Sequence, residues 1–175
     1  MGIPVEILTS EGLFTALFSP RGLREIHFPE SDGGLPTGDP GGSLTAEQHR
    51  WLLQTREALT AVLAGRIPPP LPPLDWTGHS GFRQRVWHAL LRIPPGRTAS
   101  YGEIARAVGQ PSASRAVGGA CGANPIPVLV PCHRVLASGG RTGGFSGGLD
   151  WKRRLLAIEG IAPKEKAPEK IPAPW

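Results

Sequence analysis

The residues best suited to chemistry are a cysteine and a histidine that are adjacent in the sequence, Cys132 and His133. A thiol becomes a nucleophile only when it loses its proton, and a free cysteine has a pKa of about 8.5. A nearby base or positive charge raises the thiolate fraction, and a histidine and then Arg134 follow this cysteine directly. The pair fits nucleophilic catalysis by a thiol, although successive side chains point in different directions and most such dipeptides are incidental.

The residues around this pair suggest how it is held. The apolar run 128–130 predicts a short buried strand that ends at Pro131 and presents Cys132 at its exit. Much later, Glu159 stands in the last turn of a predicted helix, just before the glycine that stops it. A carboxylate opposes the helix dipole there, so Glu159 either has a partner elsewhere in the fold or is simply solvated.

Two short helices upstream of the cysteine form a candidate helix-turn-helix. Ser100 and Glu103 make a capping box that starts a helix running to about Val108. The tight turn 109–111 follows, and Ser112 is expected to cap a second helix over 113–121.

The second of these helices has two contrasting faces. One face is expected to pack inward and carries small apolar residues: Ala113, Ala116, Val117 and Ala120. The other carries one long cation and otherwise only glycine: Arg115, Gly118, Gly119 and Gly122. Glycine costs roughly 1 kcal/mol relative to alanine inside a helix, so this bare face needs a reason. Tight packing against another helix is one reason, and entry into the minor groove of DNA, about 6 Å wide, is another.

The first half of the chain predicts a small α/β unit. The apolar runs 3–8, 13–18 and 23–28 are separated by turn formers, which is typical of a three-stranded antiparallel meander. Residues 29–43 lack periodicity and predict a mobile loop. A helix from Thr45 to Ala64 is then expected to cover the sheet.

The proline-rich segment 66–78 predicts a stiff, extended linker and marks a domain boundary. The sign of the charge also changes there. Residues 1–78 contain 5 arginines against 9 acidic residues, whereas residues 79–161 contain 11 basic residues against 3 acidic ones. A basic half beside an acidic half favours a polyanionic partner such as nucleic acid, with a solvated basic surface as the alternative.

Several classes of protein are disfavoured. No apolar run approaches the ~20 residues of a membrane helix, and the N-terminus lacks the features of a signal peptide. The two cysteines and five scattered histidines do not suggest a structural zinc site. These features predict a cytoplasmic protein with reduced thiols and no bound metal.

Residues 131–135, Pro-Cys-His-Arg-Val, resemble the signature of the O6-alkylguanine-DNA alkyltransferase family. Five further segments resemble its motifs in order and spacing: FRQRVW at 82–87, SYGEIA at 100–105, SRAVGGAC with the following NP at 114–125, GFSGG at 144–148 and LLAIEG at 155–160. The resemblance covers about residues 81–160, and the first half is similar only in architecture.

The resemblance implies a two-domain fold. Residues 1–78 would form a small α/β domain, an antiparallel sheet with a helix of the ribonuclease H-like kind. Residues 79–161 would form a mainly α domain of the winged-helix or helix-turn-helix kind, which binds DNA and transfers the alkyl group. Residues 162–175, rich in proline and lysine, predict a disordered tail.

The resemblance also implies an activity. A methylated-DNA–protein-cysteine S-methyltransferase repairs DNA by irreversible, stoichiometric transfer of the alkyl group of O6-alkylguanine to its own cysteine, with O4-alkylthymine as a further candidate substrate. The expected partner is double-stranded DNA, approached through the minor groove by a monomer that flips out the damaged base. No cofactor is expected.

Roles for individual residues follow from the resemblance. Cys132 would be the nucleophile, His133 its base through a water, and Glu159 the residue that orients His133. Asn124 would tie the recognition helix to the cysteine segment. Contacts to the flipped base or the DNA would come from eight more residues: Tyr101, Arg115, Ala116, Gly118, Arg134, Val135, Phe145 and Ser146. Among these, Phe145 departs from the tyrosine that is usual in the family.

Three other functions are compatible with parts of the pattern. A non-catalytic relative would bind alkylguanine and recruit other factors, a thiol hydrolase would use Cys132 and His133 through many turnovers, and a helix-turn-helix regulator would need no chemistry at all.

Overall fold

The structure, a computed structural model, describes residues 2–29 and 43–164. Nearly all of the predicted loop 29–43 therefore lies outside the described residues, as do residues 165–175 of the predicted tail. Residues 162–164 are described, and the amide of Lys164 donates a hydrogen bond to the carbonyl of Gly140 (2.9 Å).

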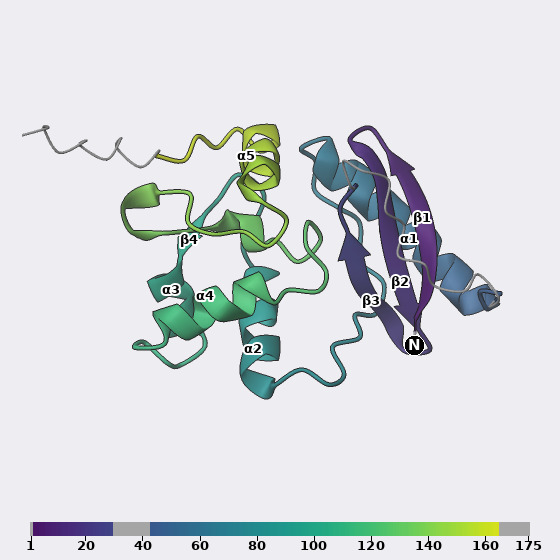
Figure 1. Ribbon diagram of the computed structural model, residues 1–175, viewed down its shortest axis with the longest axis horizontal. Coiled ribbons are helices and arrows are strands. Elements are labelled where there is room, and N and C mark those ends of the chain that lie inside the picture. The colour runs from purple at the N-terminus through teal and green to yellow at the C-terminus, as the bar shows by residue number, and fades with distance from the viewer. Residues whose placement is uncertain (1, 30–42, 165–175) are drawn as a thin grey trace, which may run out of the picture.

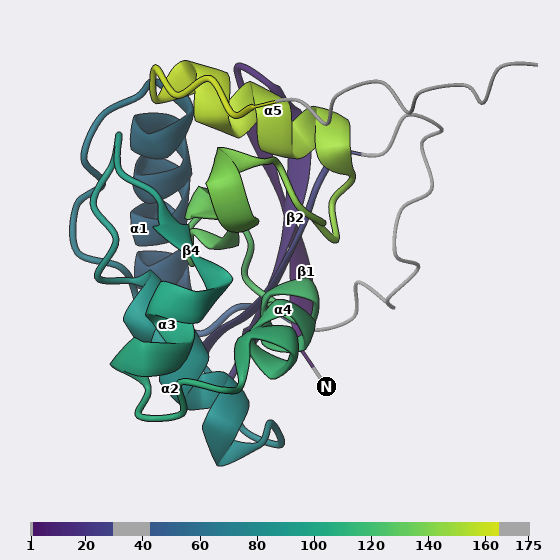
Figure 2. The same ribbon diagram turned by 90° about the vertical axis from the view of Figure 1, so that its left-hand side faces the viewer.

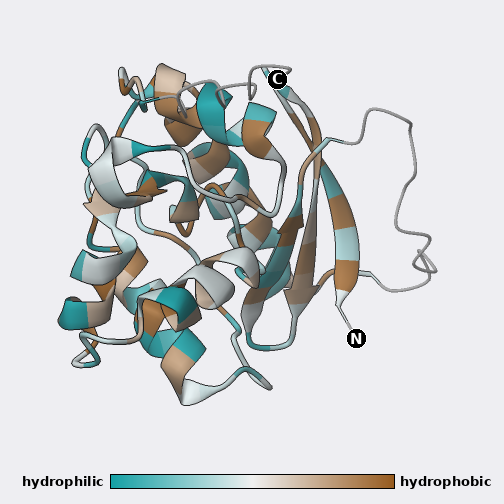
Figure 3. Ribbon diagram, turned by 60° about the vertical axis from the view of Figure 1, so that its left-hand side comes forward, coloured by the Kyte–Doolittle hydropathy of each residue, from teal (hydrophilic) through white to brown (hydrophobic). Residues whose placement is uncertain are grey.

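The first half contains the predicted meander. β1 (Ile3–Thr9), β2 (Gly12–Ser19) and β3 (Gly22–His27) pair antiparallel in sequence order, and α1 (Ala46–Leu63) lies along the sheet (Figure 1). The capping box of Thr45 and Gln48 is present. Hydrophobic residues alternate with more polar ones along the strands (Figure 3), as the period of a half-buried strand requires. The fully buried side chains of the strands include Ile7, Phe14, Phe18 and Leu23.

The linker after α1 joins the sheet instead of only spanning a gap. Leu74 pairs with Leu23 as a parallel bridge. Leu23 donates to the carbonyl of Pro73 and accepts from the amide of Asp75, both at 2.8 Å. The extended conformation that proline favours thus lets the linker lie beside β3.

The second half is mainly helical. It contains α2 (Gly81–Leu90), α3 (Tyr101–Ala107), α4 (Ser114–Gly122) and α5 (Leu149–Ile158). The short strands β4 (Ala99–Ser100) and β5 (Val135–Leu136) pair in parallel, and 3₁₀ turns cover Cys132–Arg134 and Ser138–Gly140. Helices α2, α3 and α4 pack together below α5 (Figure 2). None of the helices in the described part of the chain is long and apolar enough to cross a membrane.

Three predictions for this half are wrong. Residues 128–130 form turns and not a strand, because prolines at 125, 127 and 131 remove ladder donors and Val128 adopts a positive φ of 73°. Ser112 does not cap α4, whose N-cap is Ala113 without a side-chain hydrogen bond. Ala116 is exposed, so only Val117 and Ala120 of the expected inward face are buried.

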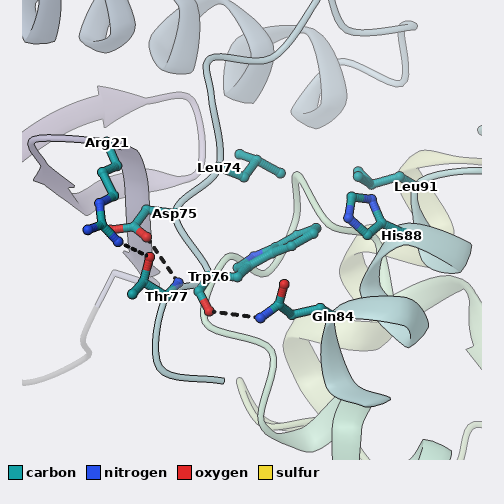
Figure 4. A pocket seen from close by; sticks show the side chains of 8 residues that line it. All are labelled: Arg21, Leu74, Asp75, Trp76, Thr77, Gln84, His88 and Leu91. Atoms are coloured by element: carbon teal, nitrogen blue, oxygen red, sulfur yellow. Dashed lines mark hydrogen bonds between the residues drawn. The ribbon is translucent and has the colours of Figure 1, made fainter. Parts of the chain in front are cut away.

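The two halves meet around the end of the linker. The rings of Trp76 and Trp87 lie 5.4 Å apart, and Trp87 donates from Nε1 to the carbonyl of Ala120 (2.9 Å). A cavity of about 460 Å³ opens there between the turn at Arg21, the linker and α2 (Figure 4). Beside it, burial alone would raise the pKa of Asp75, but hydrogen bonds from Ser19 and Thr77 outweigh burial and lower that pKa to about 2.

Gly22 offers a test of the contact between linker and sheet. Its φ is +150°, and a Cβ built there would overlap the carbonyl of Pro73. We expect Gly22→Ala to lower the free energy of unfolding by roughly 3 kcal/mol, since backbone strain adds to displacement of the linker. Gly78→Ala is the matched control, because φ there is +91° but no atom lies within 4 Å of the new Cβ. Strain alone should lower its stability by about 1 kcal/mol. Urea denaturation measures both, and equal losses would contradict the contact.

Candidate active site

Cys132 begins the 3₁₀ turn after Pro131 and is almost completely buried. The amide of Asn124 donates from Nδ2 to its Sγ (3.2 Å) and to the carbonyl of Val130 (2.8 Å). The Oδ1 of the same side chain accepts from the amide of Ile126 (3.0 Å). Because Asn124 directly follows the C-cap of α4, this one side chain joins the end of that helix to the cysteine.

His133, Arg134 and Glu159 form a second cluster beside the cysteine. Nε2 of His133 lies 3.0 Å from Oε1 of Glu159. The guanidinium of Arg134 donates to both carboxylate oxygens, from Nε at 3.0 Å to Oε2 and from Nη2 at 2.8 Å to Oε1. It also donates from Nη1 to the carbonyl of Ile93 (2.6 Å). The side chain of Glu159 is only 3% exposed, and its carboxylate is paired with Arg134. Of the two alternatives for this charge at a helix end, the structure thus shows a partner inside the fold.

These contacts determine which nitrogen of His133 can act as a base. Burial would raise the pKa of Glu159, but the hydrogen bonds and charges of His133 and Arg134 outweigh burial and lower it to about 2. Burial lowers the pKa of His133, and the nearby carboxylate only partly opposes this. A neutral imidazole facing an ionised carboxylate carries its proton on Nε2. Nδ1, which has no hydrogen-bond partner among the described residues, is then the free base.

The thiol of Cys132 is protonated at rest. Burial raises its pKa to about 11, while the hydrogen bond from Asn124 and the charge of Lys152 act in the opposite direction. The thiol is therefore not ionised in the resting protein, and it would need a base to remove its proton before it could act as a nucleophile.

Lys152 is a buried cation next to the site, and the sequence analysis did not single it out. It is completely buried in α5 and donates from Nζ to the carbonyls of Val135 (2.7 Å) and Gly144 (3.1 Å). Burial lowers its pKa to about 8. The signal in the sequence is its position, because Lys152 shares a helix face with Leu155, Leu156 and Glu159 at helical spacing, where a solvated lysine would not be found.

A cavity of about 260 Å³ opens next to this centre, between α3, α4 and residues 144–146. Its lining includes four of the predicted base-contacting residues, together with two further glycines and a second cysteine: Tyr101, Gly118, Phe145 and Ser146, with Gly122, Gly144 and Cys121. Burial raises the pKa of Tyr101, and the neighbouring thiols Cys121 and Cys132 raise it further. Its hydroxyl therefore keeps its proton and can donate a hydrogen bond into the cavity.

Val135 was expected to contact the flipped base or the DNA, and its backbone carbonyl is a group that could do so. The structure already places that oxygen on Nζ of Lys152, and the amide of Val135 donates to the carbonyl of Cys132. A carbonyl oxygen has two lone pairs, so the carbonyls of Val135 and Cys132 can each still accept one further hydrogen bond.

Arg115 and Ala116 lie exposed on the outer face of α4. No protein atom of the described residues lies within 4 Å of a Cβ built at Gly119 or Gly122, and a Cβ at Gly118 would only touch the ring of Tyr101 at 3.9 Å. The bare face is therefore not explained by tight packing against another helix. It is an open surface next to the cavity.

Comparison with known proteins gives one consistent picture. A family model described as the DNA-binding domain of 6-O-methylguanine DNA methyltransferase matches residues 81–161. A methylated-DNA–protein-cysteine methyltransferase of Mycobacterium tuberculosis is 41% identical over 168 residues, which are 96% of this chain and 92% of the relative. A protein of the same name from Methanosarcina acetivorans is 53% identical over 139 residues, 79% of this chain and 86% of the relative. The crystal structure of Mycobacterium tuberculosis OGT in complex with DNA superposes with a TM-score of 0.71 at 38% identity, covering 90% of this chain and 93% of that one.

The charge of Glu159 can be tested by the pH dependence of stability. Its pKa is lowered from 4.5 to about 2, so its contribution is complete above pH 4.5 and disappears as the pH falls towards 2. We expect Glu159→Gln to lower the free energy of unfolding by about 3 kcal/mol at pH 7, because the buried Arg134 loses its counter-charge. The difference from the wild type should shrink steadily below pH 4.5. Chemical denaturation at several pH values measures this. Glu57→Gln, an exposed site on α1, should change little, and a difference that stays constant down to pH 2 would refute the assignment.

Proposed function

The chain belongs to the family of methylated-DNA–protein-cysteine methyltransferases, and we propose that Cys132 is the residue on which it keeps the alkyl group. Proteins of this family repair O6-alkylguanine directly, by moving the alkyl group from the base to a cysteine. The observation that carries the assignment to Cys132 is its place between Asn124, which donates to its sulfur, and the His133–Glu159 pair.

The geometry suggests the order of events. Nδ1 of His133 takes the thiol proton through an intervening water, and Glu159 stabilises the imidazolium that results. The sulfur lone pair forms a bond to the alkyl carbon while the bond from that carbon to O6 breaks. The electron pair of the broken bond passes to the purine, which takes up a proton and leaves as guanine. The hydroxyl of Tyr101 polarises the departing base, and Ser146 contacts its oxygen.

The product is a thioether, and no group in the site can reverse its formation. One protein molecule therefore serves one lesion, and the reaction needs no cofactor. The second cysteine, Cys121, lines the cavity, but burial raises the pKa of its thiol to about 12 and the residue directly after it is a glycine, not a histidine. We therefore assign the transfer to Cys132 although Cys121 lies closer to the opening.

Double-stranded DNA is the partner, and the damaged base must leave the stack because O6 is paired inside the duplex. The open face of α4 suits the minor groove, where ordinary side chains would not fit. We propose that Arg115 enters the duplex and fills the space of the flipped base, with Ala116 and Gly118 allowing the close approach.

Arg134 does not fit the DNA contact predicted for it. Its guanidinium is buried, and within the described residues it donates hydrogen bonds to Glu159 and to the carbonyl of Ile93. The reason is that the buried carboxylate of Glu159, at the end of α5, would lack a cationic partner without Arg134. We propose instead that Arg134 positions Glu159 and thereby His133.

We propose that residues 1–78 are a ribonuclease H-like domain and residues 79–161 a winged-helix domain, with α3 and α4 as its helix-turn-helix. A monomer acting in the cytoplasm fits a repair protein that needs a reduced thiol and access to the genome. The non-catalytic alternative is not favoured, because a thiol is present at position 132 with a hydrogen bond from Asn124, and His133 next to it is paired with Glu159.

Mass spectrometry tests the acceptor residue. After incubation with a duplex containing O6-methylguanine, we expect the protein to gain one methyl group, located on Cys132 and not on Cys121 by peptide mapping. The gain should stop at one per molecule, and a lesion-free duplex should give none. Cys132→Ser should abolish transfer while DNA affinity stays within a few fold. Methyl groups found on Cys121 would overturn the assignment.

The role of Arg115 predicts a difference between substrates. Arg115→Ala should slow transfer from duplex DNA far more than transfer from the free base O6-benzylguanine, because only the duplex requires base flipping. Arg56→Ala removes the same charge from the exposed surface of α1 and is the matched control. Single-turnover kinetics with both substrates measure the effect. Equal losses with both substrates would exclude base flipping by Arg115.

A further inference from the structure

Phe28, a residue of the first half of the chain, packs against the wall of the cavity beside Cys132. This residue follows β3, and its ring lies 5.8 Å from that of Phe145, which lines the cavity, in an edge-to-face arrangement. On its other sides the ring meets Trp151 of α5 at 4.8 Å and Phe14 of β2 at 5.7 Å. Such aromatic pairs add about 0.5–1.5 kcal/mol each beyond the area that they bury.

Phe28 also packs on the backbone of the cavity wall. A Cβ built at Gly147 would overlap Cε2 of Phe28. The ring thus fills the space that a side chain at 147 would need. We term residues 143–148 the pocket loop. Phe28, from the half of the chain that contains β1 to β3 (the sheet half), therefore packs against the side of this loop that faces away from the cavity.

The ends of the pocket loop are held differently from its middle. Nζ of Lys152 binds the carbonyl of Gly144, and the amide of Lys152 donates to the carbonyl of Gly148 (3.2 Å). Between these points, the side chains of Phe145 and Ser146 form no hydrogen bond within the described residues. The packing of Phe28 against Phe145 and Gly147 thus adds to the hydrogen bond from the amide of Gly148 to the carbonyl of Phe145 in holding the part of the loop that faces the cavity.

We propose that Phe28 is a positioning residue that sets the shape of the lesion cavity from the sheet half, and so determines which alkyl groups fit. The inference rests on the proposed function of the cavity. If Phe28 were only part of the core between the two halves, replacing it would lower stability without changing the preference among substrates.

The preference among alkyl groups is the decisive measurement. In Phe28→Ala we expect transfer of the small methyl group from duplex DNA to slow by about tenfold, because the loop no longer aligns the base with the sulfur. Transfer of the benzyl group from O6-benzylguanine placed in the same duplex should slow less, since a looser loop gives the larger group more room. The ratio of the benzyl to the methyl rate constant should therefore rise several-fold. Phe28→Tyr keeps the ring and should restore the wild-type ratio.

Phe18→Leu is the matched control. Phe18 is a fully buried phenylalanine of the same sheet, and it makes no aromatic contact with the pocket loop. This variant should melt at a lower temperature with an unchanged ratio, when both are measured well below melting. An unchanged ratio in Phe28→Ala, or an equal change in Phe18→Leu, would overturn the inference.

A second readout does not depend on activity. The amide of Gly148 donates to the carbonyl of Phe145 (3.1 Å), so its hydrogen exchange reports the order of the pocket loop. Exchange there should be faster in Phe28→Ala than in the wild type or Phe18→Leu, and equal exchange would count against the inference. If the wild type transferred no alkyl group at all, the proposed function would fail, while this experiment would still decide whether Phe28 orders the loop.

Discussion

The site depends on one ionised carboxylate that is buried away from water. Glu159 ends α5, and its oxygens bind His133, Arg134 and the amide of Gly96. Burying a charge is unfavourable unless it is paired and fully hydrogen-bonded, and here every oxygen has at least two partners. The same contacts hold the last helix, the cysteine turn and the segment after α2 in one arrangement. They also give His133 the tautomer that leaves Nδ1 free.

A buried cation has the complementary task. Lys152 joins the carbonyl of Val135, beside the cysteine turn, to that of Gly144, at the edge of the cavity. Its positive charge acts on the sulfur in the direction of ionisation, although burial has the larger effect on that thiol. Since Lys152 and Glu159 lie on one face of α5, this short helix binds both His133 and the carbonyl of Gly144 at the edge of the cavity.

The sequence predicted the elements well where local rules apply. The strands follow from alternation and the starts of α1 and α3 from capping boxes, and the position of Glu159 at a helix end raised a distant partner as one of two alternatives. Where the outcome depends on tertiary contacts, the sequence predictions failed. Residues 128–130 are apolar because they are buried, not because they pair in a sheet. The role of Phe28 could not be inferred at all, since nothing near residue 28 in the sequence points to residues 145 and 147.

The burial of the sulfur has a consequence for the lifetime of the unreacted protein. A molecule that works once is lost whenever a stray electrophile or oxidant reaches its thiol, and thiolates react far faster than thiols. Because burial raises the pKa of this thiol to about 11, the unreactive protonated form predominates at neutral pH. The burial of Cys132 thus protects the unreacted protein from electrophiles and oxidants until a flipped base lies beside the sulfur.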